Sequence, residues 1–326
     1  MRLGVVGGGA WGTALAQVAA TGGRETMLWA LEPEVVEAVN ARHENSLFLP
    51  NIPLSEAIRA TSDLAELGSC DAWLMVTPAQ HMRVVLEHAP AGGRPLVLCS
   101  KGIEERSGKL LHEVANEVCP SSPIAVLSGP TFAHEVAAGL PTAVTLACTD
   151  RALGEQLRSR INLVQFRTYC TDDVAGAEAG GAVKNVLAIA CGVVEGKRFG
   201  QNARAALIAR GFAEMIRFGV AMGGRRETLA GLSGLGDLVL TCSSTSSRNF
   251  SLGKAIGEGG RVRDLMIDRR TVAEGAHTAP VLHRIALERD IDMPIVGAVN
   301  ELLEGEVQID ELLDTLLSRP PGDEED

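Results

Sequence analysis

The length, composition and charge of this chain exclude several classes of protein. With 326 residues it exceeds the size at which one hydrophobic core usually keeps growing, so two domains are expected. The apolar fraction of 46% and the charged fraction of 22% are those of an ordinary globular protein, which argues against disorder. The net charge of -11, without any block of Lys or Arg, argues against nucleic acid as a partner.

The cysteine pattern and the apolar runs indicate the environment of the protein. The 7 cysteines lie far apart and none forms a CxxC pair, so we expect reduced, mostly buried thiols and no metal site. No uncharged apolar run reaches about 18 residues, and no secretion signal precedes the first predicted strand. We therefore expect a cytoplasmic protein without a membrane partner.

The first half of the chain alternates short β-rich runs with helical patterns. Strands are predicted at 2–6, 24–29, 72–76, 95–99, 124–127, 142–147 and 164–168. Such alternation is typical of a parallel sheet. Continuously apolar runs such as Leu96-Val97-Leu98 indicate strands that helices cover on both faces.

From about Val174 the hydrophobic period becomes that of helices separated by Gly-rich breaks, one of them at 231–236. We predict an α/β fold with a doubly wound, Rossmann-like parallel-sheet domain over residues 1–175. An all-helical substrate and catalytic domain follows over 176–319, and a disordered tail over 320–326. Four glycines in the helix that begins at Val174 each cost ~1 kcal/mol relative to Ala, which indicates close packing or ligand approach.

A glycine motif follows the first predicted strand. Gly7, Gly9 and Gly12 form GxGxxG, and helix-favouring residues come directly after it. Gly7 permits a tight turn, Gly9 lets the backbone approach a pyrophosphate, and Gly12 allows close helix packing. The motif predicts a dinucleotide site; the alternative is a Gly-rich turn with a purely structural role.

Glu32 bears on the choice of dinucleotide. It stands 20 residues beyond Gly12, where an acidic residue that binds the ribose 2'-hydroxyl is expected. A carboxylate there would repel a 2'-phosphate, so the cofactor is NAD or NADP with a preference for NAD. Because Glu32 precedes Pro33, it could equally cap the next helix.

Polar clusters directly follow three of the apolar strands: Thr77-Pro78, Ser100-Lys101-Gly102 and Ser128-Gly129-Pro130-Thr131. Ligands of open α/β sheets bind at these carboxyl ends. Lys101 is therefore expected to meet an anionic or carbonyl oxygen near the nicotinamide. The alternative is a solvated loop lysine.

Lys184 stands alone in an otherwise apolar helical segment. Burial lowers the pKa of a lysine, which suits it to exchange a proton with a hydroxyl or carbonyl group, and Asn185 could orient it. The alternative is a surface lysine that reaches water. Asp237, at the end of a Gly-rich loop, could pair with Lys184 or cap the helix that follows.

A second anion site is indicated further along the chain. Residues 243–249 combine several hydroxyl groups with Arg248 and Asn249. A guanidinium binds phosphate bidentately, so this segment is a candidate cradle for a phosphate group.

Taken together, these clusters resemble the NAD(P)-dependent glycerol-3-phosphate dehydrogenase family over essentially the whole chain. The likeness rests on GGGAWGTALA (7–16), SKG (100–102), SGPTFAHEVAAGLPTA (128–143), GGAVKNV (180–186), GLGDLVLTC (234–242) and SRN (247–249). The resemblance implies that Lys184 is the proton acceptor and that the sugar phosphate is surrounded by Lys101, Gly129, Thr131, Asp237, Ser247, Arg248 and Asn249. It implies cofactor contacts at Ala10, Trp11, Lys101, Ala133, Arg248, Val272 and Glu274.

Two departures from the family pattern concern the cofactor. Leu31 stands where many bacterial members place a basic residue and prefer NADPH, which adds to the preference for NAD. Ala273 and Ala276-His277 differ from the usual VEGYRT segment near the second cofactor contact.

The resemblance implies reversible reduction of dihydroxyacetone phosphate to sn-glycerol 3-phosphate for glycerophospholipid synthesis, and it implies a homodimer. Without the resemblance, the same layout would fit a 3-hydroxyacid or 6-phosphogluconate dehydrogenase, or a redox sensor that binds dinucleotide without turnover.

Overall fold

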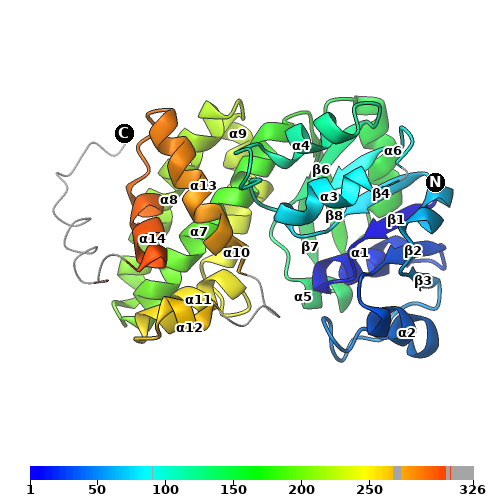
Figure 1. Cartoon of the computed structure of the whole chain (residues 1–326), viewed down its shortest axis with the longest axis horizontal. Coiled ribbons are helices and arrows are strands. Elements are labelled where there is room, and N and C mark those ends of the chain that lie inside the picture. The colour runs from blue at the N-terminus through cyan, green and yellow to red at the C-terminus, as the bar shows by residue number, and fades with distance from the viewer. Residues whose placement is uncertain (90, 267–272, 306–308, 310–326) are drawn as a thin grey trace.

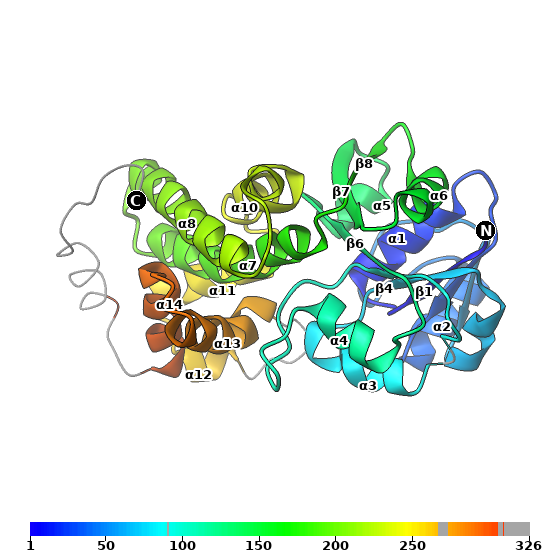
Figure 2. The ribbon, with the colours of Figure 1, turned by 90° about the horizontal axis from the view of Figure 1, so that it is seen from above.

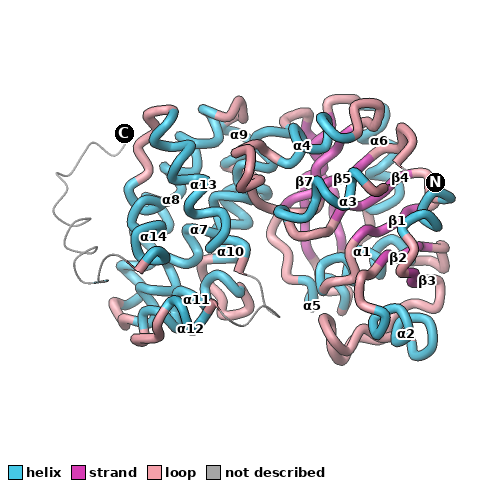
Figure 3. The backbone as a smooth tube through the Cα atoms, in the orientation of Figure 1, coloured by secondary structure: helices cyan, strands magenta, loops and turns pink. Residues whose placement is uncertain are grey.

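The computed structural model has a half that contains the sheet and a helical half, which lie side by side (Figure 1). It describes residues 1–89, 91–266, 273–305 and 309. Val272 and the predicted tail over 320–326 lie outside the described residues. Within these residues, all strands belong to the half formed by the first part of the chain (Figure 3).

The described residues form one eight-stranded sheet in the order β3-β2-β1-β4-β5-β6-β7-β8. The strands are β1 (Leu3–Val6), β2 (Thr26–Trp29), β3 (Ile58–Thr61), β4 (Ala72–Met75), β5 (Leu96–Leu98), β6 (Ile124–Ser128), β7 (Thr142–Cys148) and β8 (Phe166–Thr171). All neighbouring strands are parallel except β6 and β7, which pair antiparallel from Ala125↔Cys148 to Ser128↔Thr145.

The helices of the sheet half are α1 (Ala10–Ala20), α2 (Pro33–Arg42), α3 (Met82–Glu87), α4 (Leu111–Val118), α5 (Ala133–Ala137) and α6 (Arg151–Ile161), with 3₁₀ turns at Leu64–Ser69 and Ala79–His81. Those of the helical half are α7 (Val174–Gly196), α8 (Gly200–Ala221), α9 (Arg226–Leu229), α10 (Asp237–Thr241), α11 (Arg248–Gly257), α12 (Val262–Leu265), α13 (Glu274–Glu288) and α14 (Pro294–Glu304). A π-helical turn, Leu232–Gly236, runs directly into α10.

Helices cover both faces of the sheet. Leu74 of β4 faces the apolar cluster formed with α1, α2, α5 and α6, whereas its neighbours Trp73 and Met75 face the cluster formed with α3 and α4. Successive side chains of a strand point to opposite faces, so neighbouring residues of β4 enter different clusters. Both clusters are buried, because helices cover both faces. The predicted α/β fold with a helical second half is confirmed.

Three details of the prediction were wrong. The sheet is not wholly parallel, because β7 runs antiparallel to β6. The strand β3 was missed; it is four residues long, lies at the sheet edge and contains Arg59 and Ala60, which are weak strand formers. The predicted break at 231–236 is largely helical, since its glycines form the π turn before α10. All seven cysteines are free, and Cys170 alone among them is exposed.

The long helix α7 is the core of the helical half (Figure 2). It is long and apolar enough to cross a membrane by length and composition, but 94% of its most apolar window is buried inside the protein. Its glycines allow close packing: a Cβ on Gly180 would lie 2.6 Å from Ser233 O, and one on Gly192 would lie 2.1 Å from Phe250 O. The predicted reason for these glycines is confirmed.

Candidate active site

The carboxyl ends of four parallel strands meet at one edge of the sheet, beside α7. Gly7 follows β1, Thr77 follows β4, Lys101 follows β5 and Gly129 follows β6. The helix α7 packs against β6 and β7 and brings the helical half to this edge (Figure 2). This is the place where open α/β sheets bind their ligands.

The glycine motif forms an open turn at the start of α1. Gly7 has φ 129°, and a Cβ on Gly12 would lie 1.8 Å from Gly7 O, so both positions require glycine. A Cβ on Gly9 would meet no described atom within 4 Å, and no side chain caps α1. The N–H groups of the first turn are therefore available to a phosphate, and the loop fits a dinucleotide.

Two further expected cofactor residues lie near this turn. Trp11 belongs to the first turn of α1, and its indole Nε1 is buried without a hydrogen-bond partner among the described residues. Ala133 is the first residue of α5, which packs against α1. An unpaired buried donor marks a place that a bound molecule can complete.

A buried carboxylate bridges two lysines at the centre of the edge. Lys184 Nζ on α7 donates to Asp237 Oδ1 at 2.6 Å, and Lys101 Nζ donates to Asp237 Oδ2 at 2.6 Å. Thr241, one turn later on α10, accepts from Lys184 Nζ at 3.0 Å. Asp237 is fully buried, and only 7% of the Lys184 side chain is exposed. Lys101 also donates to Gly129 O at 3.1 Å.

The lysine on α7 has an altered acidity. Burial lowers the pKa of Lys184 to about 8, against the opposing charge of Asp237 and with the help of the nearby charge of Lys101. The burial of Lys184 excludes the alternative of a lysine that reaches water. Asp237 pairs with Lys184 and begins α10 with its side chain turned toward the lysines, so the capping alternative is also excluded.

A second carboxyl group faces the same cations from α13. Burial raises the pKa of Glu274, while the charges of Arg248, Lys184 and Lys101 oppose that rise. Arg248, the first residue of α11, is exposed, and it has no ion-pair partner among the described residues. Its charge acts on the Glu274 carboxyl group together with the charges of Lys184 and Lys101, which places its guanidinium near the same site.

The other residues of the predicted phosphate cradle lie at the start of α11. Ser247 caps this helix, and its Oγ accepts from Phe250 N at 3.2 Å, which leaves the hydroxyl proton to donate. Asn249 is buried: its Nδ2 donates to Asn185 Oδ1 at 3.0 Å, and its Oδ1 accepts from Gly275 N at 2.9 Å. Asn249 thus joins α11 to α7 and α13.

The loop after β6 completes the edge. Gly129 has φ 156°, and a Cβ there would lie 2.9 Å from Val144 Cα on β7, so the chain turns tightly at this point. Thr131 Oγ1 donates to Gly129 O at 3.3 Å. Thr131 is half-buried next to the carbonyl group that Lys101 also contacts.

Comparison with known proteins decides the family. Models of the N-terminal and C-terminal parts of NAD-dependent glycerol-3-phosphate dehydrogenase match residues 2–154 and 173–314. The chain belongs to this family.

Relatives match over nearly their full length. The NAD(P)+ glycerol-3-phosphate dehydrogenase of Erythrobacter litoralis is 62% identical over 319 residues, which are 98% of this chain and 96% of that protein. The crystal structure of glycerol-3-phosphate dehydrogenase from Coxiella burnetii has a TM-score of 0.92 at 38% identity, covering 98% of this chain and 99% of that one. The enzyme from Saccharomyces cerevisiae has a TM-score of 0.81 at 27% identity, covering 97% and 99%.

In this member of the glycerol-3-phosphate dehydrogenase family, Glu32 is the N-cap residue of α2, but its side chain makes no capping hydrogen bond. Leu31 beside it is 72% exposed. The structure therefore does not support a capping role for the Glu32 carboxylate, and this carboxylate is available to accept a hydrogen bond from a bound molecule.

Two contributors to the site escaped the sequence analysis. Thr241 follows Asp237 by four residues, so helical spacing could have placed it on the face of the lysine pair. Ser233, together with the expected Ser128, has a buried hydroxyl without a partner among the described residues. Ser128 Oγ and Lys101 Cγ would each lie 3.3 Å from a Cβ on Gly181. No local pattern distinguishes Ser233 from the other serines.

Proposed function

We propose that this chain catalyses the reversible reduction of dihydroxyacetone phosphate to sn-glycerol 3-phosphate with NADH or NADPH. The observation that supports it most is the buried Asp237 carboxylate that joins Lys184 and Lys101 at the same edge of the sheet as the glycine turn of α1. The names of its relatives point to the same substrate pair. The product would feed glycerophospholipid synthesis.

Lys184 is proposed as the proton donor in reduction and the proton acceptor in oxidation. A bound NADH or NADPH would supply the hydride that the carbonyl carbon needs, and the protein would have to supply the proton to the carbonyl oxygen. A pKa of about 8 keeps both forms of Lys184 accessible near neutrality, which suits an acid and base used in both directions. Thr241 and Asp237 hold its Nζ in place.

Lys101 is proposed to polarise the carbonyl group and hold the substrate. Its Nζ lies between Gly129 O and Asp237 Oδ2, at the edge where the substrate would enter. A fixed positive charge stabilises the negative charge that develops on the oxygen during hydride transfer. Asp237 holds both lysines at once and acts through them.

The phosphate group of the substrate is proposed to bind at the start of α11. Arg248 offers an exposed guanidinium, Ser247 a hydroxyl donor and Asn249 a buried amide. Gly129 and Thr131 would contact the sugar carbons or oxygens from the opposite side.

The cofactor is proposed to bind along the start of α1, with NAD preferred. Its contacts would be Gly7, Gly9, Ala10, Trp11, Gly12, Glu32, Lys101, Ala133, Arg248 and Glu274. The N–H groups of α1 would hold the pyrophosphate, and Glu32 the ribose 2'-hydroxyl. Val272 stays an expectation from the resemblance.

The same proposal covers the domain boundary, the location in the cell and the oligomeric state. We place the boundary between the cofactor domain and the catalytic domain at residue 175, within the first turn of α7. We also propose a cytoplasmic enzyme that forms a homodimer, which light scattering of the purified protein and cell fractionation would test.

The purified enzyme should oxidise NADH or NADPH when dihydroxyacetone phosphate is added. The loss of nicotinamide absorbance measures this oxidation. The matched controls are 3-oxoacids added with NADH or NADPH and 6-phosphogluconate added with NADP+, which should leave the nicotinamide unchanged. Protein that binds cofactor but does not turn over dihydroxyacetone phosphate would refute the proposal and favour a redox sensor.

A further inference from the structure

A hairpin between β5 and α4 joins the two halves of the protein. Ile103 and Leu110 pair as an isolated antiparallel bridge, and both are buried in the apolar core of the helical half. At its tip, a Cβ on Gly108 would lie 3.2 Å from Arg284 Nη2 and 3.6 Å from Ile285 Cδ1 of α13. The hairpin comprises residues 102–110. One of its sides therefore packs into the helical half.

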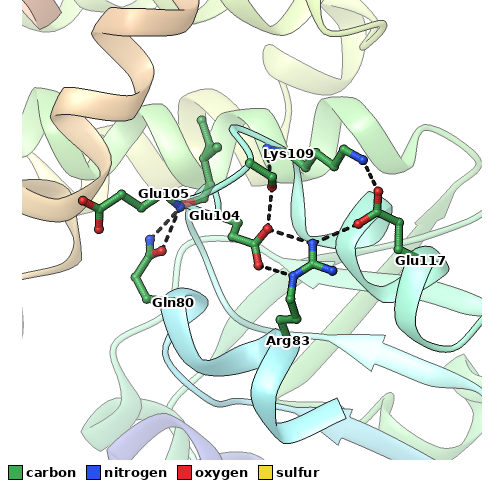
Figure 4. Close-up of polar contacts among 8 residues, drawn as sticks. Gln80, Arg83, Glu104, Glu105, Lys109 and Glu117 are labelled. Atoms are coloured by element: carbon green, nitrogen blue, oxygen red, sulfur yellow. Dashed lines mark hydrogen bonds and ion pairs between the residues drawn. The ribbon is translucent and has the colours of Figure 1, made fainter. Parts of the chain in front are cut away.

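The other side of the hairpin is tied to the sheet half by charge (Figure 4). Arg83 of α3 donates its Nε to Glu104 Oε1 at 2.7 Å and its Nη2 to Glu104 Oε2 at 2.8 Å. The same Nη2 donates to Glu117 Oε2 of α4 at 2.9 Å. Only 7% of the Glu104 side chain is exposed. Two parallel bonds to one carboxylate fix both position and direction.

A neutral clamp holds the backbone next to this pair. Gln80 donates its Nε2 to Ile103 O at 2.9 Å, and its Oε1 accepts from Glu105 N at 2.8 Å (Figure 4). Ser107 Oγ donates to Glu104 from within the hairpin. The hairpin is thus anchored on both sides, through apolar contacts to one half and polar contacts to the other.

Lys101 stands directly before the hairpin. Gly102, with φ 147°, is the one residue between Lys101 and Ile103, and a Cβ on it would lie 3.0 Å from Ala79 Cβ. A shift of the hairpin must therefore move the backbone of Lys101, whose Nζ lies 2.6 Å from Asp237.

We propose that Arg83 and Glu104 are positioning residues for the reaction, which hold the hairpin so that Lys101 meets Asp237. This inference rests on the proposed function and extends it to residues that touch neither substrate nor cofactor. Misplacement of a reacting group by about 1 Å can lower the rate about 100-fold, so a residue that anchors the hairpin outside the site can change the rate of the reaction.

The acidity of Lys184 reports the position of Lys101. The groups that face Lys184 are Asp237 and Thr241 from α10, Lys101 from the base of the hairpin, and Glu274 from α13. The positive charge of Lys101 lowers the pKa of Lys184, whereas Asp237 raises it. If the hairpin loosens and Lys101 withdraws, this pKa must rise above about 8.

The test compares Arg83→Lys and Glu104→Gln with Arg158→Lys as the matched control. Arg83→Lys keeps the charge but loses the parallel bonds, and Arg158 forms an exposed pair with Glu155 at 2.6 Å on α6. Both hairpin variants should lower kcat for dihydroxyacetone phosphate reduction about 10-fold and move the alkaline limb of the pH profile upward. The Kd for cofactor alone should change less than kcat, because most of the proposed cofactor contacts lie outside the hairpin. The control should match the wild type throughout.

The double variant and hydrogen exchange complete the design. Because the two residues act as one unit, kcat of the double variant should be no lower than kcat of the less active single variant. Amide exchange should accelerate at Glu104 and Gly108, whose N–H groups bond within the hairpin. If Glu104→Gln does not fold, two variants remain: Arg83→Lys, and Glu117→Gln, which removes the negative charge that Glu117 presents to Arg83 and Lys109.

The outcomes separate this inference from the proposed function. A wild type without dihydroxyacetone phosphate reductase activity defeats the proposed function, whatever the exchange data show. An active wild type whose hairpin variants keep kcat and the alkaline limb defeats the positioning role. A lower kcat with an unmoved limb also defeats it, because simple loss of stability would produce that result.

Discussion

Replacing Asp237 by Asn removes the negative charge that pairs with both Lys101 and Lys184 while keeping the shape of the side chain. Both lysines would then face an amide group, and the repulsion between their charges would no longer be compensated. Reduction needs Lys184 protonated, so we expect activity at neutral pH to fall and the alkaline limb of the pH profile to move downward.

The size of the effect follows from the geometry. Each lysine Nζ lies 2.6 Å from a carboxylate oxygen of the fully buried Asp237. At an effective dielectric constant of about 20, unit charges this close attract by about 6 kcal/mol, and desolvation cancels a large part of that. If about 2 kcal/mol is lost from charged Lys184, its pKa falls by about 1.5 units. The limb should therefore move from about 8 to about 6.5.

The assay is the pH dependence of kcat/KM for dihydroxyacetone phosphate reduction, with urea unfolding measured beside it. We expect kcat/KM at neutral pH to fall about 10-fold or more, and the free energy of unfolding to drop by about 3 kcal/mol. Asp264→Asn, which disrupts an exposed pair with Arg261 at 2.7 Å, is the control. An unchanged alkaline limb in the Asp237 variant would refute the reasoning.

Three further substitutions test the remaining roles. Lys184→Ala should lower kcat by about 100-fold to 10,000-fold and leave the cofactor Kd, measured by nicotinamide fluorescence, unchanged; retained turnover would remove its proton-transfer role. Glu32→Ala should raise kcat/KM with NADP relative to NAD, because a carboxylate repels the 2'-phosphate, and an unaltered ratio would leave Glu32 without a role in cofactor choice. Gly12→Ala places a Cβ 1.8 Å from Gly7 O and should weaken cofactor binding at least about 10-fold in titration. Gly68→Ala, where a Cβ meets no described atom within 4 Å, should bind normally.

Local features of the chain were readable from the sequence. The turn depends on the positive φ of Gly7 and on the close approach of Gly12 to Gly7 O, both local features, so the glycine pattern predicted it. Buried strands such as β5 were predicted from uninterrupted apolar runs, and the lone lysine in an apolar helix marked Lys184. The family followed from ordered motifs.

The direction of strands and the pairing of distant charges were decided only by the tertiary structure. β6 and β7 are both buried runs, and apolar periodicity is the same for a parallel and an antiparallel neighbour, so the reversal of β7 left no pattern. The short edge strand β3 depends on pairing with β2 rather than on its own residues.

Asp237 shows the same limit within the site. The sequence by itself determined that a carboxylate stood after a Gly-rich loop, and it left pairing and capping open. Asp237 lies 53 positions from Lys184 and 136 from Lys101, so only the packing of α10 against α7 and of the hairpin base against both brings the three together. The shared burial that lowers the pKa of Lys184 arises from that packing, because desolvation depends on neighbours in space and not along the chain.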